Sequence, residues 1–332
     1  MSIENVRIQD VAVEENMDKN KQMKEKNFLS AVLYLNSAEN AKQLGDFLDR
    51  LCNNLQENFL HYEVICVDDD TRQDMLEEVK RIRKKYEDTS ITILHMSYYQ
   101  GMEMSMNAGR DLAIGDFVME FDECVWNFPD DCIMQVYREC LRDCDIVCCG
   151  DEEKKKLGSK LFYSLFNRFS NMQYQLESDN FRILSRRGIN RMQSLNHSTP
   201  YRKALYANCG LKFKVMHYQP VKTAVYKHDK KEKKSRRNLA INSLLLFTDI
   251  GYSIAAFMAI AMAIVMVCVA VYALVIFMKG IAIVGWTTTI LFLAAAFFGL
   301  FVILAIVIKY LSLLLNLNFR KQRYMFASIE KL

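Results

Sequence analysis

YEVICVDDD, residues 62–70, is a short apolar run that ends in three aspartates, and it decides the fold class. Three further runs of similar length accompany it along the chain, namely FLSAVLYL (28–35), SITILHM (90–96) and DFVMEFDE (116–123). Each has the length and the near-continuous apolar character of a strand that is buried on both faces. These four stretches therefore predict the central strands of one β-sheet.

The segments between these strands have the charged, amphipathic character of surface helices. The predicted helices are Glu39 to Leu55, Thr71 to Tyr86, Met102 to Ile114 and Pro129 to Arg142, and a fifth strand follows at residues 145–149. Strands that alternate with helices predict an α/β domain, with a mainly parallel sheet and helices on both faces. We expect this domain to span residues 28–226, after a flexible charged leader at residues 1–27.

Two acidic clusters fall where predicted strands end, at Asp68–Asp70 and at Asp122-Glu123. Ligands of open α/β sheets bind at the carboxyl ends of the strands. A carboxylate at that edge can hydrogen-bond a nucleoside, or hold a divalent cation against a diphosphate. The alternative interpretation is a solvated turn or a helix cap, where aspartate is common. Two clusters at equivalent places in the sheet favour the ligand site.

The last third of the chain contains two uncharged apolar runs, Ile250 to Met278 and Gly280 to Ile308, separated by Lys279. Each run is longer than the ~20 residues that a helix needs to cross a bilayer. We therefore predict a hairpin of two transmembrane helices, at residues 252–278 and 281–308. Neither run carries an ionisable residue, which disfavours a channel or transporter.

Basic residues flank the predicted hairpin on both sides, in a juxtamembrane or interface segment at 227–251 and in a basic tail at 309–332. The positive-inside rule places both flanks in the cytoplasm, and residues 1–27 contain no apolar signal core. We expect a multi-pass protein of the plasma (inner) membrane, whose N-terminal domain and C-terminal tail are cytoplasmic. The basic clusters lack the interleaved aromatics of single-strand binders, so we expect membrane lipid as the partner and no nucleic acid.

The ordered set of motifs resembles a known family. YEVICVDDD is followed by NAGRDLAIGDFVMEFDE (107–123), by FRILSRR (181–187), and by the two spans with their basic tail. This order resembles the family-2 glycosyltransferases with a GT-A fold, in particular those acting on polyisoprenyl phosphates, such as dolichol-phosphate mannose synthase and the bactoprenol glucosyltransferases. The resemblance covers roughly Phe28 to the C-terminus. It implies transfer of a sugar from a nucleoside-diphosphate sugar to a polyisoprenyl phosphate at the cytosolic membrane face, with Mg²⁺ or Mn²⁺ as cofactor.

The resemblance also implies roles for individual residues. It assigns nucleotide-sugar binding to Asp68, Asp69, Gly101, Asn107 and Asp122, metal binding to Asp122, catalysis to Asp122 and Arg182, and acceptor-phosphate binding to Arg182, Lys222 and Lys227. Arg323-Tyr324 resemble the family's C-terminal Arg-Pro-X-Tyr. The resemblance further implies that this chain can form a homo-oligomer, since relatives of this kind can form tetramers.

One departure from the family pattern concerns the metal. Cys124 stands where the family has the second aspartate of its Asp-X-Asp motif, and a thiol is a poor ligand for a hard cation. An alternative function therefore stays open, a catalytically impaired relative that binds nucleotide-sugar, lipid phosphate or a partner protein. An active enzyme should respond to divalent metal or carry a compensating carboxylate near Asp122.

Overall fold

The computed structural model describes most of the N-terminal two thirds of the chain. The described ranges are 24–35, 40–152, 157–170, 174–194, 201–221, 230–248 and 324–332, with scattered positions between 257 and 314. The chain divides into a larger unit, formed by residues 1–167, 172–240 and 321–332, and a second unit of residues 168–171 and 241–320. The larger unit contains the sheet.

In the second unit, the scattered positions described between 257 and 314 are helical. None of the helices formed by described residues is both long and apolar enough to cross a membrane. The predicted spans at 252–278 and 281–308 lie largely outside the described residues and stay predictions.

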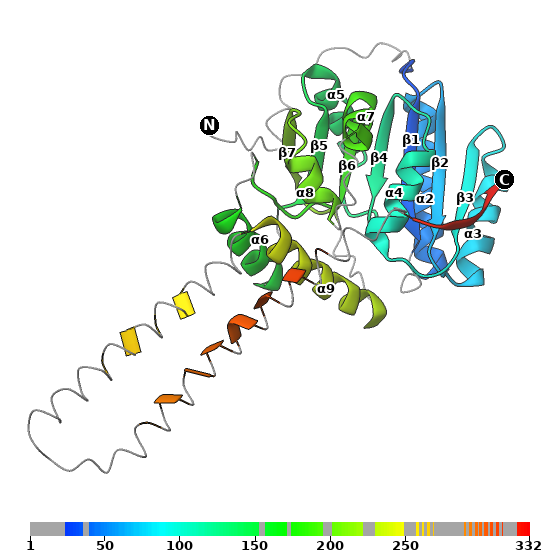
Figure 1. The fold of residues 1–332 in the computed structure, drawn as a ribbon. Coiled ribbons are helices and arrows are strands. Elements are labelled where there is room, and N and C mark those ends of the chain that lie inside the picture. The colour runs from blue at the N-terminus through cyan, green and yellow to red at the C-terminus, as the bar shows by residue number, and fades with distance from the viewer. Residues whose placement is uncertain are drawn as a thin grey trace, which may run out of the picture. The chain divides into compact units, whose positions relative to one another are not determined.

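The larger unit is built on a sheet of eight described strands (Figure 1). They are β1 (Leu29–Leu35), β2 (Tyr62–Asp68), β3 (Ser90–Met96), β4 (Phe117–Phe121), β5 (Ile146–Asp151), β6 (Phe181–Ser185), β7 (Phe213–Tyr218) and β8 (Phe326–Lys331). Their order is β7-β5-β6-β4-β1-β2-β3-β8. β4, β1, β2 and β3 run parallel to their neighbours in this group, β5 is parallel to β7, and β6 is antiparallel to both β4 and β5.

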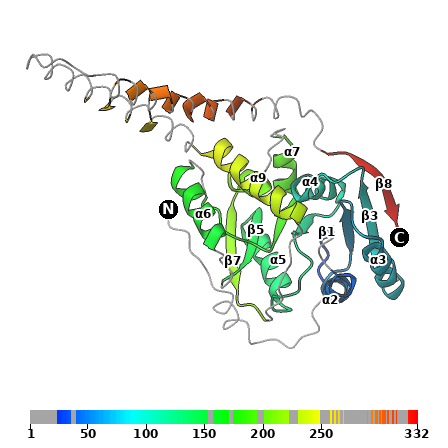
Figure 2. The same ribbon diagram turned by 90° about the horizontal axis from the view of Figure 1, so that it is seen from below.

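Helices cover both faces of this sheet, with α2 (Ala41–Asn58), α3 (Gln73–Lys85) and α5 (Cys132–Arg142) on one face and α4 (Met102–Leu112), α7 (Arg186–Ser194) and α8 (Arg202–Ala207) on the other. The further described helices are α6 (Leu157–Phe169) and α9 (Lys230–Phe247). Side chains alternate across the strands, so Leu33 of β1 joins the core with α2, α3 and α5, whereas Val32 joins the core with α4, α7 and α8. Figure 2 shows α2 and α5 on the face of the sheet opposite to α4 and α7. The prediction of a mainly parallel α/β domain with two covered faces is confirmed.

Helix α4 approaches the sheet closely because it has glycine at its contact point. A Cβ atom on Gly109 would lie 2.5 Å from Val32 Cγ1 and 2.6 Å from Val67 Cγ2. Such distances are too short for a side chain, so only glycine lets α4 lie this close to β1 and β2. The close packing fixes where the N-terminus of α4 meets the carboxyl ends of those strands.

The C-terminal segment adds a feature that the sequence did not predict. Residues 309–332 were expected only as a basic tail, but β8 pairs antiparallel with β3 and becomes the edge strand of the sheet. Met325 N–H donates to Gln100 Oε1 (3.0 Å), and the Tyr324 hydroxyl donates to Asp111 Oδ2 (3.1 Å). Arg323, the other residue of the tail motif, lies outside the described residues.

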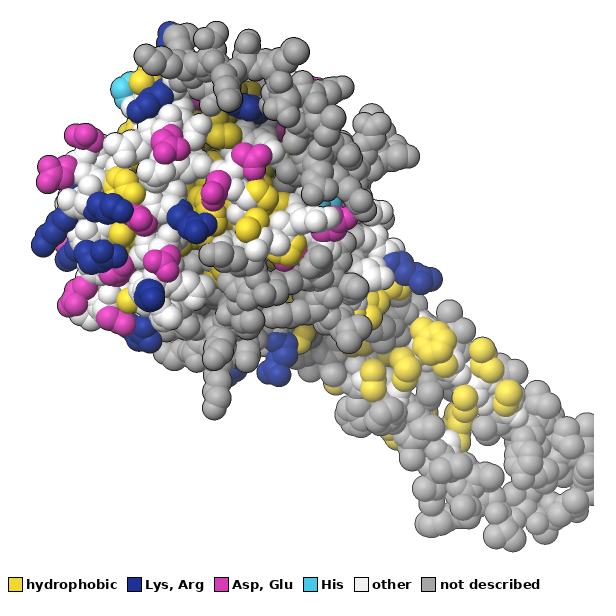
Figure 3. Space-filling view, turned by 180° about the vertical axis from the view of Figure 1, so that it is seen from behind, with side chains coloured by type: hydrophobic (Ala, Val, Ile, Leu, Met, Phe, Trp, Pro, Cys, Tyr) yellow, Lys and Arg dark blue, Asp and Glu magenta, His cyan; other side chains and the backbone are white. Residues whose placement is uncertain are grey.

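The surface of the described part carries charges of both signs. On the face seen in Figure 3, Lys and Arg side chains are interspersed with Asp and Glu rather than gathered into a patch of one sign.

Candidate active site

The carboxylate of Asp69 is held at the end of β2 by uncharged donors. Asp69 is 3% exposed. Its Oδ1 accepts the Gln100 N–H (2.7 Å), and its Oδ2 accepts the Gly101 N–H (2.8 Å) and the Tyr34 hydroxyl (3.1 Å). Gly101 is the N-cap residue of α4 and has φ +85°, a conformation that favours glycine. Asp69 therefore anchors the start of α4 to the carboxyl end of β2.

Asp69 and Asp68 differ in their partners. Burial raises the pKa of Asp69, and the N–H groups of Gln100 and Gly101 oppose that rise only in part. Asp68 Oδ1 accepts the Thr71 N–H (2.8 Å), and its Oδ2 is hydrogen-bonded to His95 Nδ1 (2.7 Å). Both carboxylates thus already have partners inside the domain, and their predicted nucleotide-binding role stays a prediction.

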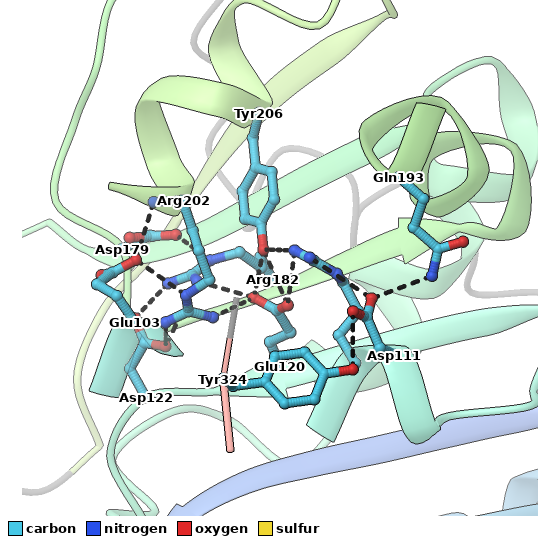
Figure 4. A network of polar contacts seen from close by, with 11 residues as sticks. Glu103, Asp111, Glu120, Asp122, Asp179, Arg182, Gln193, Arg202, Tyr206 and Tyr324 are labelled. Carbon is cyan, nitrogen blue, oxygen red and sulfur yellow. Dashed lines mark hydrogen bonds and ion pairs between the residues drawn. The ribbon is translucent and has the colours of Figure 1, made fainter. Parts of the chain in front are cut away.

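The carboxylate of Asp122 is held at the end of β4 by two arginines (Figure 4). Asp122 is 6% exposed. Arg182 Nη2 donates to its Oδ2, and Arg202 Nη2 donates to its Oδ1 (2.8 Å). Arg182 lies on β6 and Arg202 begins α8. Oδ1 also accepts a longer hydrogen bond from Arg182 Nη1 (3.4 Å), so both oxygens of Asp122 are engaged by guanidiniums.

Glu120, on β4, lies at the centre of the same group of charges. Its Oε2 accepts Arg182 Nη1 (3.0 Å) and Arg202 Nη1 (2.6 Å), and the Tyr206 hydroxyl donates to Oε1 (2.9 Å). Glu120 and Arg182 are completely buried. Charges at such depth persist only when they are paired and hydrogen-bonded.

Arg182 and Arg202 each have a further carboxylate partner. Asp179 accepts Arg182 Nε (2.8 Å) and pairs with Lys203, while Glu103 accepts Arg202 Nε (3.0 Å). We call the whole group the charge cluster. It comprises the carboxylates Glu103, Glu120, Asp122 and Asp179, and the cations Arg110, Arg182, Arg202 and Lys203. Arg110 also pairs with Asp111 (3.8 Å), so the connected ion pairs join five carboxylates to four cations.

The pairing keeps Asp122 and Arg202 ionised. Burial disfavours the charged form of Asp122, but the charges of Arg182 and Arg202 outweigh burial and hold its pKa well below the usual range. Burial likewise opposes the charge of Arg202, yet Asp122 and Glu103 keep the pKa of that guanidinium well above its ordinary value.

The two acidic strand ends belong to one site. β1 lies between β2 and β4 in the sheet. The Tyr34 hydroxyl at its end bonds Asp69, and the Tyr34 carbonyl accepts the Cys124 thiol (3.7 Å). The first turn of α4 forms a second link, since Gly101 binds Asp69 and Glu103 binds both N–H (2.8 Å) and Nε of Arg202. Asp69 and Asp122 lie at the same edge of the sheet, as the sequence predicts.

The described residues do not fit a divalent-metal site. Mg²⁺ and Mn²⁺ require oxygen ligands, but both oxygens of Asp122 are engaged by Arg182 and Arg202. Cys124 is fully buried and its thiol faces the Tyr34 carbonyl. Within the described ranges, no group of three or more His, Cys, Asp or Glu side chains is arranged to hold a metal. Metal binding by Asp122 therefore rests on the resemblance alone.

The remaining predicted residues have varied positions. Arg182 directs Nε, Nη1 and Nη2 at carboxylates of the charge cluster, so in this arrangement it does not face an acceptor phosphate. Asn107 lies on α4, and its Oδ1 is buried without a hydrogen-bond partner among the described residues. Lys222 and Lys227 lie outside the described residues. The roles predicted for these four residues stay predictions.

Sequence analysis missed most of the charge cluster. Glu120 gave one usable signal, because it stands inside the apolar run DFVMEF and a buried strand tolerates a carboxylate only with partners. Glu103, Arg202 and Tyr206 lie in helices of ordinary composition and gave no signal.

Comparison with known proteins identifies the family. The family model "Glycosyl transferase family 2" matches residues 32–204. An uncharacterized glycosyltransferase of Synechocystis sp. is 26% identical over 188 residues, which cover 55% of this chain and 58% of that protein. The uncharacterized glycosyltransferase YkcC of Bacillus subtilis is 21% identical over 164 residues, covering 48% of this chain and 50% of that protein. The chain thus spans between half and three fifths of the length of these relatives.

Solved structures show a more distant similarity. The mannosyltransferase PcManGT from Pyrobaculum calidifontis, in complex with GDP-Man and Mn²⁺, is 12% identical with a TM-score of 0.44, covering 89% of this chain and 92% of that one. Glucosyl-3-phosphoglycerate synthase from Mycobacterium tuberculosis, in complex with Mn²⁺, UDP-Glc and phosphoglyceric acid, is 14% identical with a TM-score of 0.43, covering 66% and 79%. Because the family model matches residues 32–204, more than half of the 332 residues, this chain belongs to glycosyl transferase family 2.

Proposed function

We propose that this chain transfers a sugar from a nucleoside-diphosphate sugar to a polyisoprenyl phosphate at the cytosolic face of the plasma membrane. The proposal rests on one observation. Two acidic strand ends, at Asp69 and Asp122, lie together in one site of a family 2 domain. Ligands of such sheets bind at this edge. Transfer activity and both substrates are inferred from the site and the family.

The donor binds along the carboxyl ends of β2 and β1 and the first turns of α4. Asp68 and Asp69 face the nucleoside in this proposal, and Gly101 lets the backbone come close to it. Asn107 supplies a specific contact, because its buried Oδ1 has no partner in the described part of the chain. A buried acceptor of this kind is costly to leave unpaired, and a donor hydroxyl or N–H would satisfy it.

The acceptor phosphate approaches from the membrane. Its support is in the sequence, where the uncharged runs 250–278 and 280–308 predict a membrane anchor and Lys222 and Lys227 precede them. A phosphate is already an anion near neutral pH, so the reaction requires positioning more than a strong general base. A phosphate oxygen forms the new bond to the anomeric carbon, the bond from that carbon to the diphosphate breaks, and the nucleoside diphosphate leaves.

A second function is favoured by two specific observations. Cys124 replaces a family carboxylate, and Asp122 is engaged by two arginines. A family member that binds nucleotide-sugar or lipid phosphate without transferring the sugar would tolerate both features. Measuring transfer and binding on the same preparation separates the two functions.

The test uses the purified full-length protein in phospholipid vesicles with undecaprenyl phosphate and a panel of radiolabelled nucleotide-sugars. We expect chloroform-extractable label from one donor only. Asn107→Ala should raise the KM for that donor while the folded state is retained. Asp143→Asn serves as the matched control, because Asp143 is exposed and pairs with Lys212 at the surface. Absence of label with every donor, from folded protein that still binds a nucleotide in calorimetry, would support the binding function instead.

A further inference from the structure

The C-terminal strand β8 is fixed along β3 and also to the loop 97–101, which joins β3 to α4. Figure 2 shows β8 beside β3, with which it pairs. Beyond the paired residues, the Leu332 N–H donates to the Ile91 carbonyl (3.0 Å) at one end. At the other end, the Ser97 N–H donates to the Met325 carbonyl (3.1 Å). The C-terminal segment therefore reaches from the start of β3 to the start of this loop.

Gln100 joins β8 to the part of the loop that holds Asp69. Its side-chain Oε1 accepts the Met325 N–H (3.0 Å), and its Nε2 donates to the Met325 carbonyl. The backbone N–H of Gln100 donates to Asp69 Oδ1 (2.7 Å), and the Gly101 N–H donates to Asp69 Oδ2 (2.8 Å). The loop is therefore held by Asp69 on one side and by the C-terminal segment on the other.

His95 forms a second link, between β8 and Asp68. Its Nδ1 is hydrogen-bonded to Asp68 Oδ2 at the end of β2 (2.7 Å), and its Nε2 is hydrogen-bonded to Glu330 Oε2 of β8 (3.3 Å). Lys80 of α3 pairs with the other oxygen of Glu330 (2.8 Å). Because the imidazole is held at both ring nitrogens, β8 helps to fix the direction in which the Asp68 carboxylate points.

These links lie near the surface, unlike the charge cluster. The side chains of Asp68, His95 and Glu330 are 12%, 22% and 40% exposed, and Tyr98 in the middle of the loop is 59% exposed. The loop thus presents a solvent-exposed side at the carboxyl ends of β2 and β3. Ligands of open α/β sheets bind at this edge, so a donor can reach the segments that β8 fixes.

We infer that β8 is part of the donor site, and that Gln100 and His95 are the positioning residues through which it fixes loop 97–101 and Asp68 for a nucleoside diphosphate. The inference rests on the proposed function, because it concerns the same donor. Gln100 and His95 act through their neighbours in this assignment. A strand that only closed the sheet edge would stabilise the fold without changing nucleotide affinity, so affinity separates the two roles.

The first test uses the reciprocity of coupled equilibria. If the docked strand strengthens nucleotide binding, a bound nucleotide must stabilise the docked strand by the same factor. Calorimetry of the full-length protein with UDP, GDP, ADP and CDP identifies the nucleotide that binds, and hydrogen exchange is then measured with and without it. We expect exchange in residues 324–332 to become about threefold slower or more with nucleotide. Helix α5, on the opposite face of the sheet, should keep its exchange rates.

The outcomes of this test distinguish the inference from the proposed function. Unchanged exchange in residues 324–332, in protein that binds a nucleotide, would overturn the inference and leave the proposed function standing. Absence of calorimetric binding with all four nucleotides would overturn both.

The second test measures nucleotide affinity after the Gln100 link is removed. Gln100→Ala loses the bonds to Met325 but keeps the backbone N–H that donates to Asp69. We expect the Kd to rise about threefold to tenfold, which corresponds to the loss of one or two hydrogen bonds. Gln135→Ala is the matched control, because the Gln135 amide bonds Asp131 on the opposite face, and its Kd should equal that of wild type. An unchanged Kd in Gln100→Ala would contradict the inference.

The third test changes β8 itself, at a residue outside the loop. Glu330→Leu removes the acceptor of His95 Nε2, so we expect weaker nucleotide binding, whereas Glu330→Gln keeps an acceptor oxygen and should restore most of the affinity. Glu57→Leu is the control, because Glu57 is an exposed carboxylate on α2 that bonds Asn53 of the same helix. Equal Kd values for wild type and a folded Glu330→Leu would contradict the role assigned to His95.

Discussion

Asp69 and Asp122 occupy corresponding places in the sheet, yet they are held by different chemistry. Each follows a parallel strand that neighbours β1. Asp69 accepts hydrogen bonds from backbone N–H groups and a tyrosine, and burial raises its pKa. Asp122 accepts from two guanidiniums, whose charges outweigh burial and lower its pKa. Topology therefore decides where a carboxylate lies, and its neighbours decide whether it is kept ionised.

The largest effect is predicted for removing an arginine that holds Asp122. Arg182→Met should lower the free energy of unfolding by about 3–5 kcal/mol, because it leaves buried carboxylates without their partner. Urea denaturation followed by circular dichroism measures the change. The matched control Arg187→Met removes an exposed partner of Asp145 and should cost less than about 1 kcal/mol. Similar costs for the two variants would mean that the charge cluster does not stabilise the fold.

The same substitution at both strand ends compares them directly. Asp122→Asn should cost about 3 kcal/mol or more, because it removes a charge that two buried guanidiniums require. Asp69→Asn should cost only about 1–2 kcal/mol, because its amide oxygen can still accept from Gly101 and Tyr34 and only the bond from the Gln100 N–H loses its acceptor. Chemical denaturation at neutral pH measures the free energy of unfolding of both variants. A larger cost for Asp69→Asn would reverse the proposed difference.

Acidification should change the stability contributions of Asp122 and Asp69 in opposite directions. The depressed pKa of Asp122 means that its stabilisation is present above the unfolded-state pKa near 4 and is lost as the pH falls below about 4. The raised pKa of Asp69 has the opposite sign, so its contribution favours the folded state in acid and is lost as the pH rises through its folded-state pKa. Thermal unfolding midpoints between pH 3 and 6 should fall less steeply in Asp122→Asn than in wild type, and more steeply in Asp69→Asn. Parallel profiles would contradict both assignments.

The smallest effect concerns the loop that anchors Asp69. The Gln100 side chain bonds both the N–H and the carbonyl of Met325, so Gln100→Ala should cost about 1 kcal/mol. Hydrogen exchange should show faster exchange in residues 97–101 and 324–332, with the charge cluster unchanged. Gln135→Ala, on α5 at the opposite face, is the control and should leave these segments protected. Unchanged exchange in Gln100→Ala would show that the loop is held by other contacts.

The sequence predicted the local parts of this structure and missed its long-range parts. The periodicity of residues 28–149 identified five strands and the helices between them, because burial of a strand or of a helix face imposes a pattern on neighbouring residues. Asp69 and Asp122 followed from their places at strand ends. Arg202 could not be found in this way, since it meets Asp122 from a position 80 residues away along the chain. β6 and β8 were also missed, because antiparallel insertion between β4 and β5 and pairing at the sheet edge leave no local pattern.

The edge strand β8 has a consequence for how the protein is made. Its partner β3 ends at Met96, but β8 begins only at Phe326. At about 5–20 residues per second, ribosomal synthesis leaves the edge of β3 without this partner for roughly ten to fifty seconds. An open strand edge during this interval is a template for pairing with another nascent chain. A product that terminates before Phe326 would lack β8 and would leave this edge of β3 unpaired.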